Sequence, residues 1–207
     1  MDNNAKIRCA VFASGSGTNS ENLIHHAQEN PNFEIPVVIC DKPKAKVIDR
    51  CKDLNTQCLV IPYAGSKAEH EKNILDALSA YDVDWIFLAG YMRILQQDFL
   101  DIFFDAELGT SRIVNIHPSR LPEFPGINAY QRAFDAGVET SGVTVHFVDG
   151  GIDSGPIILQ KTFPRKTDDT LESFTQRGFA LEYKTYIEAI DILLQKISQP
   201  AYQEKRA

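Results

Sequence analysis

Short apolar runs alternate along this chain with segments whose apolar residues recur at helical spacing, and this alternation most constrains the fold. The apolar runs, which we predict to be strands, cover residues 7–13, 34–40, 57–61, 85–89 and 112–117. Between these runs, apolar residues recur at helical spacing, and we predict helices there. They are Leu23, Ile24 and Ala27; Val47, Ile48 and Cys51; Ile74, Leu75 and Leu78; and a short segment around residues 98–104. Strands that alternate with helices form a mostly parallel sheet covered on both faces, so we predict an α/β fold.

The last third of the chain departs from this repeating unit. We predict a helix over residues 129–136, strands over 141–148 and 157–163, and a long helix over 169–197. The glycine-rich connection between the two strands, residues 149–155, is too short to hold a crossover helix. The last two strands are therefore expected to pair antiparallel.

Size and composition predict one soluble domain that spans residues 1–207. Hydrophobic residues make up 43% and charged residues 24%, which is ordinary for a globular protein. The net charge of −7 argues against binding to a nucleic-acid backbone, which requires a basic face. Cys9, Cys40, Cys51 and Cys58 show no metal-binding spacing and are expected to be reduced.

The ends of the chain and its apolar runs predict the compartment. The start, Met1-Asp2-Asn3-Asn4, has no basic region followed by a long apolar stretch, so we expect no signal peptide. The longest apolar run, residues 85–92, is too short to span a bilayer. We therefore expect a cytoplasmic protein with small-molecule substrates and no membrane partner.

A glycine-rich loop, residues 14–19, joins the first strand to the first helix. Backbone N–H groups at a helix start, with the side chains of Thr18 and Asn19, form a small anion site after Gly17. Thr18 or Asn19 could also simply cap the helix. A dinucleotide site is the competing interpretation, with Asp41 on a ribose, but Ser20 stands where a third glycine is needed. One phosphate of a mononucleotide-like substrate fits best.

Asn115 and His117 lie two residues apart at the end of the fifth strand, so their side chains share one face. A structural alternative is a capped strand end with a hydrogen-bonded histidine. Asp153 comes from the loop with three glycines and is by itself typical of a turn. If the three converge, the amide and a protonated imidazole would stabilise an oxyanion, and the carboxylate would hold the imidazole charged. That arrangement favours acyl transfer.

The other histidines are expected to have lesser roles. His146 shares a strand face with Thr144 and is expected to be structural, or else to support the catalytic residues. His25, His26 and His70 are expected on solvated helix surfaces. We find no serine or cysteine nucleophile motif and no ligand set for a metal. Direct transfer to a substrate amine is the economical hypothesis.

Five motifs together resemble the folate-dependent formyltransferases, and within that family the members that formylate glycinamide ribonucleotide in purine synthesis. The resemblance covers nearly the whole chain. The motifs are residues 12–19 (FASGSGTN), 88–95 (LAGYMRIL), 115–119 (NIHPS), 142–148 (GVTVHFV) and 153–158 (DSGPII). The resemblance implies a Rossmann-like sheet of seven strands whose last part is antiparallel. It also implies 10-formyltetrahydrofolate as cosubstrate and no metal.

The resemblance also implies roles for individual residues. Asn115, His117 and Asp153 would be catalytic, and Glu182 would contact the ribonucleotide. The substrate phosphate would bind to Gly17, Thr18 and Asn19 in the N-terminal part. The residues implied to bind folate are Lys67, Met92, Arg93, Ile94, Leu95, Asn115, Asp149, Gly150, Gly151, Ile152 and Asp153. The C-terminal part would thus serve folate binding and catalysis.

Four positions depart from the family pattern and affect the expected substrate contacts. Lys67 stands where arginine is usual, Arg120 replaces a leucine, Asn128 replaces a common histidine, and Tyr183 replaces a histidine. Lysine keeps the charge but loses the fork geometry of arginine. The oligomeric state stays open, with a homodimer among the options.

Related activities fit the sequence less well. Formyltransferases that act on tRNA resemble this chain around residues 115–119 but have a further C-terminal barrel and a basic face. Formyltetrahydrofolate hydrolases share the three catalytic residues but have an N-terminal regulatory domain, whereas the first strand here begins at Ile7. Formyltransferases of sugar nucleotides match the phosphate loop less closely. A silent nucleotide-binding module would leave Asn115, His117 and Asp153 unexplained.

Overall fold

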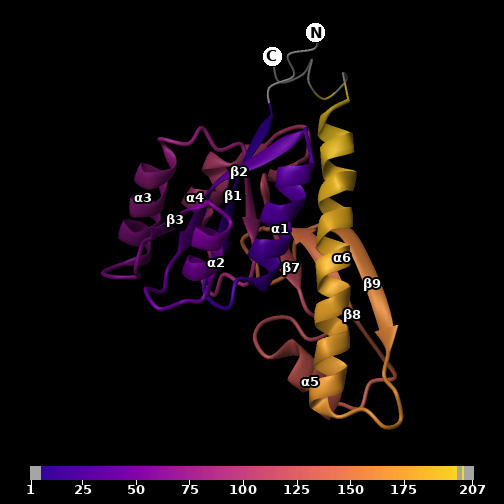
Figure 1. Cartoon of the computed structure of the whole chain (residues 1–207). Helices are drawn as coiled ribbons and strands as arrows, with labels where there is room; N and C mark the ends of the chain where they lie inside the picture. The colour runs from indigo at the N-terminus through magenta and orange to yellow at the C-terminus, as the bar shows by residue number, and fades with distance from the viewer. Residues whose placement is uncertain (1–5, 200–201, 203–207) are drawn as a thin grey trace. The chain divides into compact units, whose positions relative to one another are not determined.

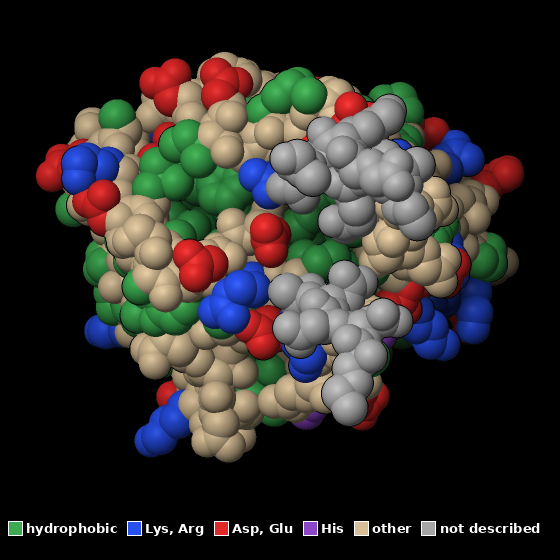
Figure 2. All heavy atoms as spheres, turned by 90° about the horizontal axis from the view of Figure 1, so that it is seen from above, with side chains coloured by type: hydrophobic (Ala, Val, Ile, Leu, Met, Phe, Trp, Pro, Cys, Tyr) green, Lys and Arg blue, Asp and Glu red, His purple; other side chains and the backbone are tan. Residues whose placement is uncertain are grey.

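The computed structural model describes residues 6–199 and residue 202. The expectation about a signal peptide at Met1-Asp2-Asn3-Asn4 lies outside the described residues. The four cysteines are free, with Cys58 partly exposed and the other three buried. Within the described part of the chain, no helix is both long and apolar enough to cross a membrane. Figure 2 shows acidic, basic and apolar side chains mixed over one face of the molecule.

Strands and helices alternate as the sequence predicts. The first elements are β1 (Ile7–Ala13), α1 (Thr18–Glu29), β2 (Phe33–Cys40), α2 (Val47–Asp53), β3 (Gln57–Val60), α3 (Lys67–Leu78), β4 (Trp85–Leu88) and α4 (Gln97–Ile102). They are followed by β5 (Phe104–Asp105), β6 (Thr110–Ser111), β7 (Ile113–His117), α5 (Ala129–Asp135), β8 (Thr140–Phe147), β9 (Ile157–Pro164) and α6 (Leu171–Ile197).

Seven strands form one sheet in the order β3-β2-β1-β4-β7-β8-β9, which confirms the predicted mostly parallel, Rossmann-like sheet with an antiparallel last part. The short pair β5 and β6 was not predicted. We expected the helix near residue 98 to continue to residue 104, but it ends at Ile102 and the chain enters β5. Two-residue strands give too little periodicity to detect.

The chain divides into two compact units, which are described separately. The first extends to Asp105 and includes Ser111–Val114, and the second holds Ala106–Thr110 and the chain from Asn115 onward. In the first unit β1 pairs in parallel with both β2 and β4, and β2 pairs in parallel with β3. Helices α1 and α2 pack against each other and against β2 (Figure 1). Its largest fully buried side chains include Phe12, Trp85 and Phe87.

The second unit is built around an antiparallel pair and a long helix. β8 and β9 pair from Thr140 opposite Pro164 to His146 opposite Ile157, with an irregularity at His146. Helix α6 packs along both strands, and α5 packs against α6 (Figure 1). Thr170 and Ser173 form a capping box at the start of α6. This helix buries Phe174 against Tyr130 of α5 and Phe163 of β9.

Candidate functional site

The loop of residues 14–19 in the first unit turns sharply into α1. Gly17 precedes the helix with a φ of 76° and a ψ of 17°, in the left-handed region that glycine adopts without strain. A Cβ atom added there would lie 2.6 Å from the Cβ of Val47, so the backbone of this loop and α2 approach too closely for any side chain. Glycine is therefore required at position 17 for two independent reasons.

Helix α2 holds this loop in place. The Val47 N–H donates to the Gly15 carbonyl at 3.2 Å, and Arg50 Nε donates to the Ser16 carbonyl at 2.8 Å. Arg50 also forms an ion pair with Glu21 in the first turn of α1. Helix α2 is thus bonded both to this loop and to α1, the helix that the loop leads into.

No side chain among the described residues caps α1, so the interpretation of Thr18 or Asn19 as the cap is wrong. Thr18 is instead the first helical residue and Asn19 the second. The first N–H groups of a helix have no intrahelical partner, and the positive end of the helix dipole favours an anion there. Residues 17–19 thus form the glycine turn and helix start on which the predicted anion site depends.

Asp41 is not available to a ribose, which removes the dinucleotide alternative. It follows β2, its side chain is buried, and its Oδ2 accepts a hydrogen bond from Arg93 Nε at 2.8 Å. A carboxylate that reads a ribose must reach its hydroxyl groups. Asp41 instead positions Arg93.

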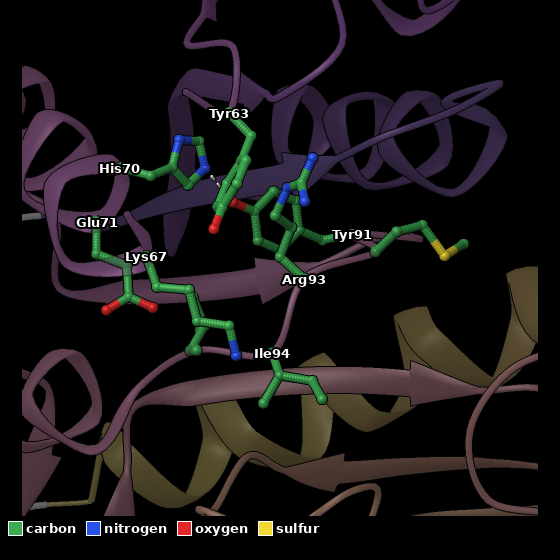
Figure 3. Close-up of a pocket in the computed structure, with 9 residues that line it drawn as sticks. Tyr63, Lys67, His70, Glu71, Tyr91, Arg93 and Ile94 are labelled. Carbon is green, nitrogen blue, oxygen red and sulfur yellow. Dashed lines mark hydrogen bonds between the residues drawn. The ribbon is translucent and has the colours of Figure 1, made fainter. Parts of the chain in front are cut away.

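A pocket of about 270 Å³ lies in the first unit, beside α3 and the segment that follows β4 (Figure 3). Its lining consists of Tyr63, Lys67, His70, Glu71, Tyr91, Met92, Arg93, Ile94 and Leu95. All five residues of this unit that the resemblance assigns to folate lie in this lining. Met92 and Ile94 are 66% and 52% exposed, so they offer apolar surface to a ligand.

Sequence reasoning missed Tyr63, His70, Glu71 and Tyr91, and it placed His70 wrongly. His70 is buried, and its Nε2 lies 3.0 Å from the Tyr91 hydroxyl, a bond drawn in Figure 3. Burial, and then the charge of Arg93, lowers the pKa of His70. A signal was present, because His70, Ile74 and Leu78 are spaced four residues apart on the buried face of α3.

Aromatic and charged side chains stack along the same wall (Figure 3). The Arg93 guanidinium lies 4.0 Å from the centre of the Tyr63 ring, and that ring lies 5.2 Å from the ring of His70. Glu71 Oε1 accepts the Gln96 N–H at 2.8 Å. Burial raises the pKa of Glu71. Arg93 and Glu71 are thus both engaged in holding the wall.

The three predicted catalytic residues meet in the second unit. Asn115 and His117 come from β7, and Asp153 comes from the loop between β8 and β9, where its φ is 50°. His117 Nδ1 lies 3.1 Å from Asp153 Oδ2, and Asn115 Nδ2 donates to Asp153 Oδ1 at 3.3 Å. A non-glycine residue in the left-handed region is uncommon and strained, and such strain clusters at functional sites. Asp153 is therefore more than a turn residue.

The loop after β7 completes this cluster. The Gly126 N–H donates to Asp153 Oδ2 at 2.7 Å, and His117 Nε2 lies 2.9 Å from the Phe124 carbonyl oxygen. A carbonyl only accepts, so His117 Nε2 carries a proton and donates it. In the neutral ring Nδ1 is then unprotonated and faces Asp153.

Burial shifts the pKa of both His117 and Asp153. Burial lowers its pKa and outweighs the Phe124 carbonyl and Asp153, which both raise it. For Asp153, burial raises the pKa, but interactions with His146, the hydrogen bond from Gly126 and the proximity of His117 bring it below its ordinary value. Burial and Asp153 thus act on the pKa of His117 in opposite directions, and the charged His117 stays a prediction.

His146 and Thr144 support the cluster from β8. His146 is buried, and its Nδ1 donates to the Phe147 carbonyl at 2.8 Å, which leaves Nε2 to accept from Asn115 Nδ2 at 3.3 Å. Thr144 Oγ1 donates to the Ser119 carbonyl at 2.7 Å and accepts the Leu121 N–H at 3.1 Å. His146 thus contacts Asn115, one of the predicted catalytic residues, directly, whereas Thr144 fixes the start of the loop after β7.

Glu182 lies buried in α6, where Tyr130 of α5 binds it. The Tyr130 hydroxyl donates to Glu182 Oε1 at 2.7 Å. The Tyr130 ring fits because residue 178 is glycine, since a Cβ atom there would lie 2.3 Å from its Cζ. Burial, together with the Glu182 charge, raises the pKa of Tyr130. Sequence reasoning did not identify Tyr130.

The remaining predicted residues lie in the loop between β8 and β9. Asp149 Oδ1 accepts the Gly151 N–H at 3.0 Å and the Ser154 hydroxyl at 2.7 Å. Ile152 is 58% exposed, and Gly150 is exposed as well. Among the described residues, no three His, Cys, Asp or Glu side chains are grouped to hold a metal ion.

Comparisons with known proteins agree with this geometry. Residues 7–190 match the family described as formyl transferase. The chain is 42% identical over 188 residues to phosphoribosylglycinamide formyltransferase of Bacillus subtilis (strain 168), over 89% of this chain and 93% of that protein. A crystal structure of phosphoribosylglycinamide formyltransferase from Bacillus halodurans superposes with a TM-score of 0.83 at 39% identity, over 93% of this chain and 96% of that one. Glycinamide ribonucleotide transformylase 1 from Symbiobacterium toebii gives 0.85 at 37% identity, over 92% and 89%.

Proposed function

The chain belongs to the formyl transferase family, and on that premise we propose that it is a phosphoribosylglycinamide formyltransferase of purine synthesis. It transfers the formyl group of 10-formyltetrahydrofolate to the amino group of 5-phosphoribosylglycinamide. The observation that carries this proposal is the convergence of Asn115, His117 and Asp153 in one cluster with distances of 3.1 and 3.3 Å. We propose that this reaction takes place in the cytoplasm.

The proposed binding roles follow the local geometry of each unit. Gly17, Thr18 and Asn19 bind the substrate phosphate, because they lie at the start of α1, where the positive end of the helix dipole favours an anion. The pocket beside α3 takes the folate, whose flat ring system suits the exposed apolar surface of Met92 and Ile94.

Further substrate contacts are proposed from the resemblance. Lys67, Arg93 and Leu95 add to the folate pocket. The resemblance also assigns folate contacts to Asp149, Gly150, Gly151, Ile152 and Asp153. Glu182 contacts the ribonucleotide, with its carboxylate oriented by Tyr130.

The cosubstrate supplies the formyl group when it is bound, and the protein's residues manage charge and protons. Attack by the amine places negative charge on the formyl oxygen, and Asn115 and His117 stabilise that charge. Burial disfavours the charged His117 ring and Asp153 favours it, and we propose that His117 takes up the proton that the amine releases and so becomes a charged donor. Asp153 stabilises the charged imidazole and relays the proton toward the departing nitrogen.

The contacts of Asn115 are compatible with this role. Its two bonds, to Asp153 and to His146, are both 3.3 Å long, near the outer limit of a hydrogen bond. Bonds of this length are weak, so the amide can turn toward a substrate oxygen at small cost. His146 receives one of these bonds and is thereby proposed to support Asn115.

An absorbance assay for the folate product tests the proposal. Formation of tetrahydrofolate only in the presence of glycinamide ribonucleotide supports the transferase. Product without the ribonucleotide indicates a hydrolase, and no product with either mixture contradicts both. Asp153→Asn serves as the inactive control, and Asp76→Asn, on the exposed face of α3, serves as the matched control for the same chemical change.

A further inference from the structure

Ser14 is the first residue of the phosphate loop, and it also bonds to the segment that lines the pocket. Its Oγ accepts the Met92 N–H at 3.0 Å, and its own N–H donates to the Gly90 carbonyl at 3.2 Å. The two bonds lie on either side of Tyr91, whose ring packs edge-on against Phe12 at 5.3 Å and belongs to the pocket wall.

The pocket segment, residues 90–95, lies outside any helix or strand, so its position depends on tethers. Arg93 is bound to Asp41 at the end of β2, and the adjacent Gln96 N–H is bound to Glu71 of α3. Ser14 supplies the tether that comes from the phosphate loop. Gly90 has a φ of 74°, so the chain turns sharply just where Ser14 holds it.

Burial makes this tether worth more than a surface bond. Ser14 is only 3% exposed, so water does not easily replace its hydroxyl. Removal of the Oγ atom leaves the Met92 N–H without this acceptor, and an unsatisfied, partly buried donor is costly. The segment would then relax away from the geometry that forms the pocket wall.

We infer that Ser14 is a positioning residue for the formyl donor. The Ser14 hydroxyl holds residues 90–95 in place and thereby sets the affinity of the pocket for folate. This inference rests on the proposed function, because it takes the pocket to be the folate site. Ser14 is not proposed to touch either substrate.

Calorimetric titration of Ser14→Ala tests the inference, with folic acid as a non-reactive probe and glycinamide ribonucleotide titrated separately. The Kd of folic acid should rise about five-fold, the factor that corresponds to one hydrogen bond of typical net strength. The Kd of the ribonucleotide should stay within about two-fold, because α2 and not the Ser14 hydroxyl holds the phosphate loop.

Ser20→Ala is the matched control. Ser20 is equally buried, lies on α1 beside the same loop, and its Oγ has no hydrogen-bond partner within the described residues. This variant should change neither Kd. An unchanged folic acid Kd in Ser14→Ala, or an equal rise for both ligands, overturns the inference. If the wild-type chain does not bind folic acid, the inference is overturned; the proposed function falls with it only if the activity assay also gives no product.

If Ser14→Ala is too unstable to be titrated, a second pair of variants tests the same hydroxyl. Threonine and valine have nearly the same volume and differ in the hydroxyl, so Ser14→Thr and Ser14→Val disturb the packing alike. If Ser14→Thr binds folic acid more tightly than Ser14→Val does, and the two variants bind the ribonucleotide equally, the positioning role is supported. Equal folic acid binding by the two variants contradicts it.

Discussion

His117 and Asp153 face each other across 3.1 Å, between Nδ1 of the ring and Oδ2 of the carboxylate. The other ring nitrogen of His117 donates to the Phe124 carbonyl at 2.9 Å. Because Nε2 already carries a proton, Nδ1 can donate to the Asp153 carboxylate only when the ring is charged. The pair therefore gains a hydrogen bond when His117 takes up a proton, which suits a reaction in which an amine loses one.

Asp153→Asn should reduce kcat by roughly 10²- to 10⁴-fold, the usual contribution of an acid–base group. The amide keeps the shape of the side chain but cannot stabilise a charged imidazole. The KM for the folate should change only modestly. Steady-state kinetics measures both values, and near-normal turnover would contradict the assigned role.

The pKa of His117 should lie below 6.5 in the free protein, because burial disfavours the charged ring. Asp153 raises this pKa, so in Asp153→Asn the midpoint should fall further. NMR titration of the ring resonances measures both midpoints. A higher midpoint in the variant than in the wild type would show that the sign of the interaction is wrong.

The same shift affects stability. The unfolded chain titrates His117 at its ordinary pKa, so below pH 6.5 the unfolded state binds a proton more readily than the folded state. The His117 contribution to the free energy of unfolding is therefore fully present above pH 6.5 and is lost as the pH falls through the folded-state pKa. Denaturation by urea from pH 7.5 to 5 should show that His117→Gln flattens this dependence.

Asn19→Leu should weaken binding of glycinamide ribonucleotide and spare folate, because the start of α1 is the proposed phosphate site. Loss of one hydrogen bond to a charged group predicts a Kd about ten-fold or more higher. Gln28→Leu replaces an exposed amide near the other end of the same helix and should change neither affinity. Calorimetry compares the variants, and an equal loss for both ligands in Asn19→Leu counts against the site.

Gly17→Ala should lower the free energy of unfolding by roughly 1–3 kcal/mol or more, through its positive φ and its contact with Val47. Gly15→Ala, in the same loop, should stay within about 0.5 kcal/mol, because a Cβ there meets nothing within 4 Å. Urea denaturation measures both changes. Equal stability of the two variants would contradict the tight approach of α2 to this loop.

The sequence by itself determined the alternation of strands and helices and the antiparallel last pair. The first follows from local periodicity and the second from a short connection. The pair Asn115 and His117 could be assigned to one face because side chains alternate along a strand, and the family motifs pointed to Asp153.

Tertiary structure alone decided which groups meet and in which direction their surroundings shift their pKa values. His70 was expected in solvent because it is polar, but it lies on the buried face of α3. Tyr130 could not be identified from the sequence, because its contacts with Gly178 and Glu182 form only in the folded chain. The lowered pKa of His117 depends on burial, which no sequence spacing reports. Ser14 and Met92 are joined across 78 residues, and such a long-range bond exists only once the strands have assembled.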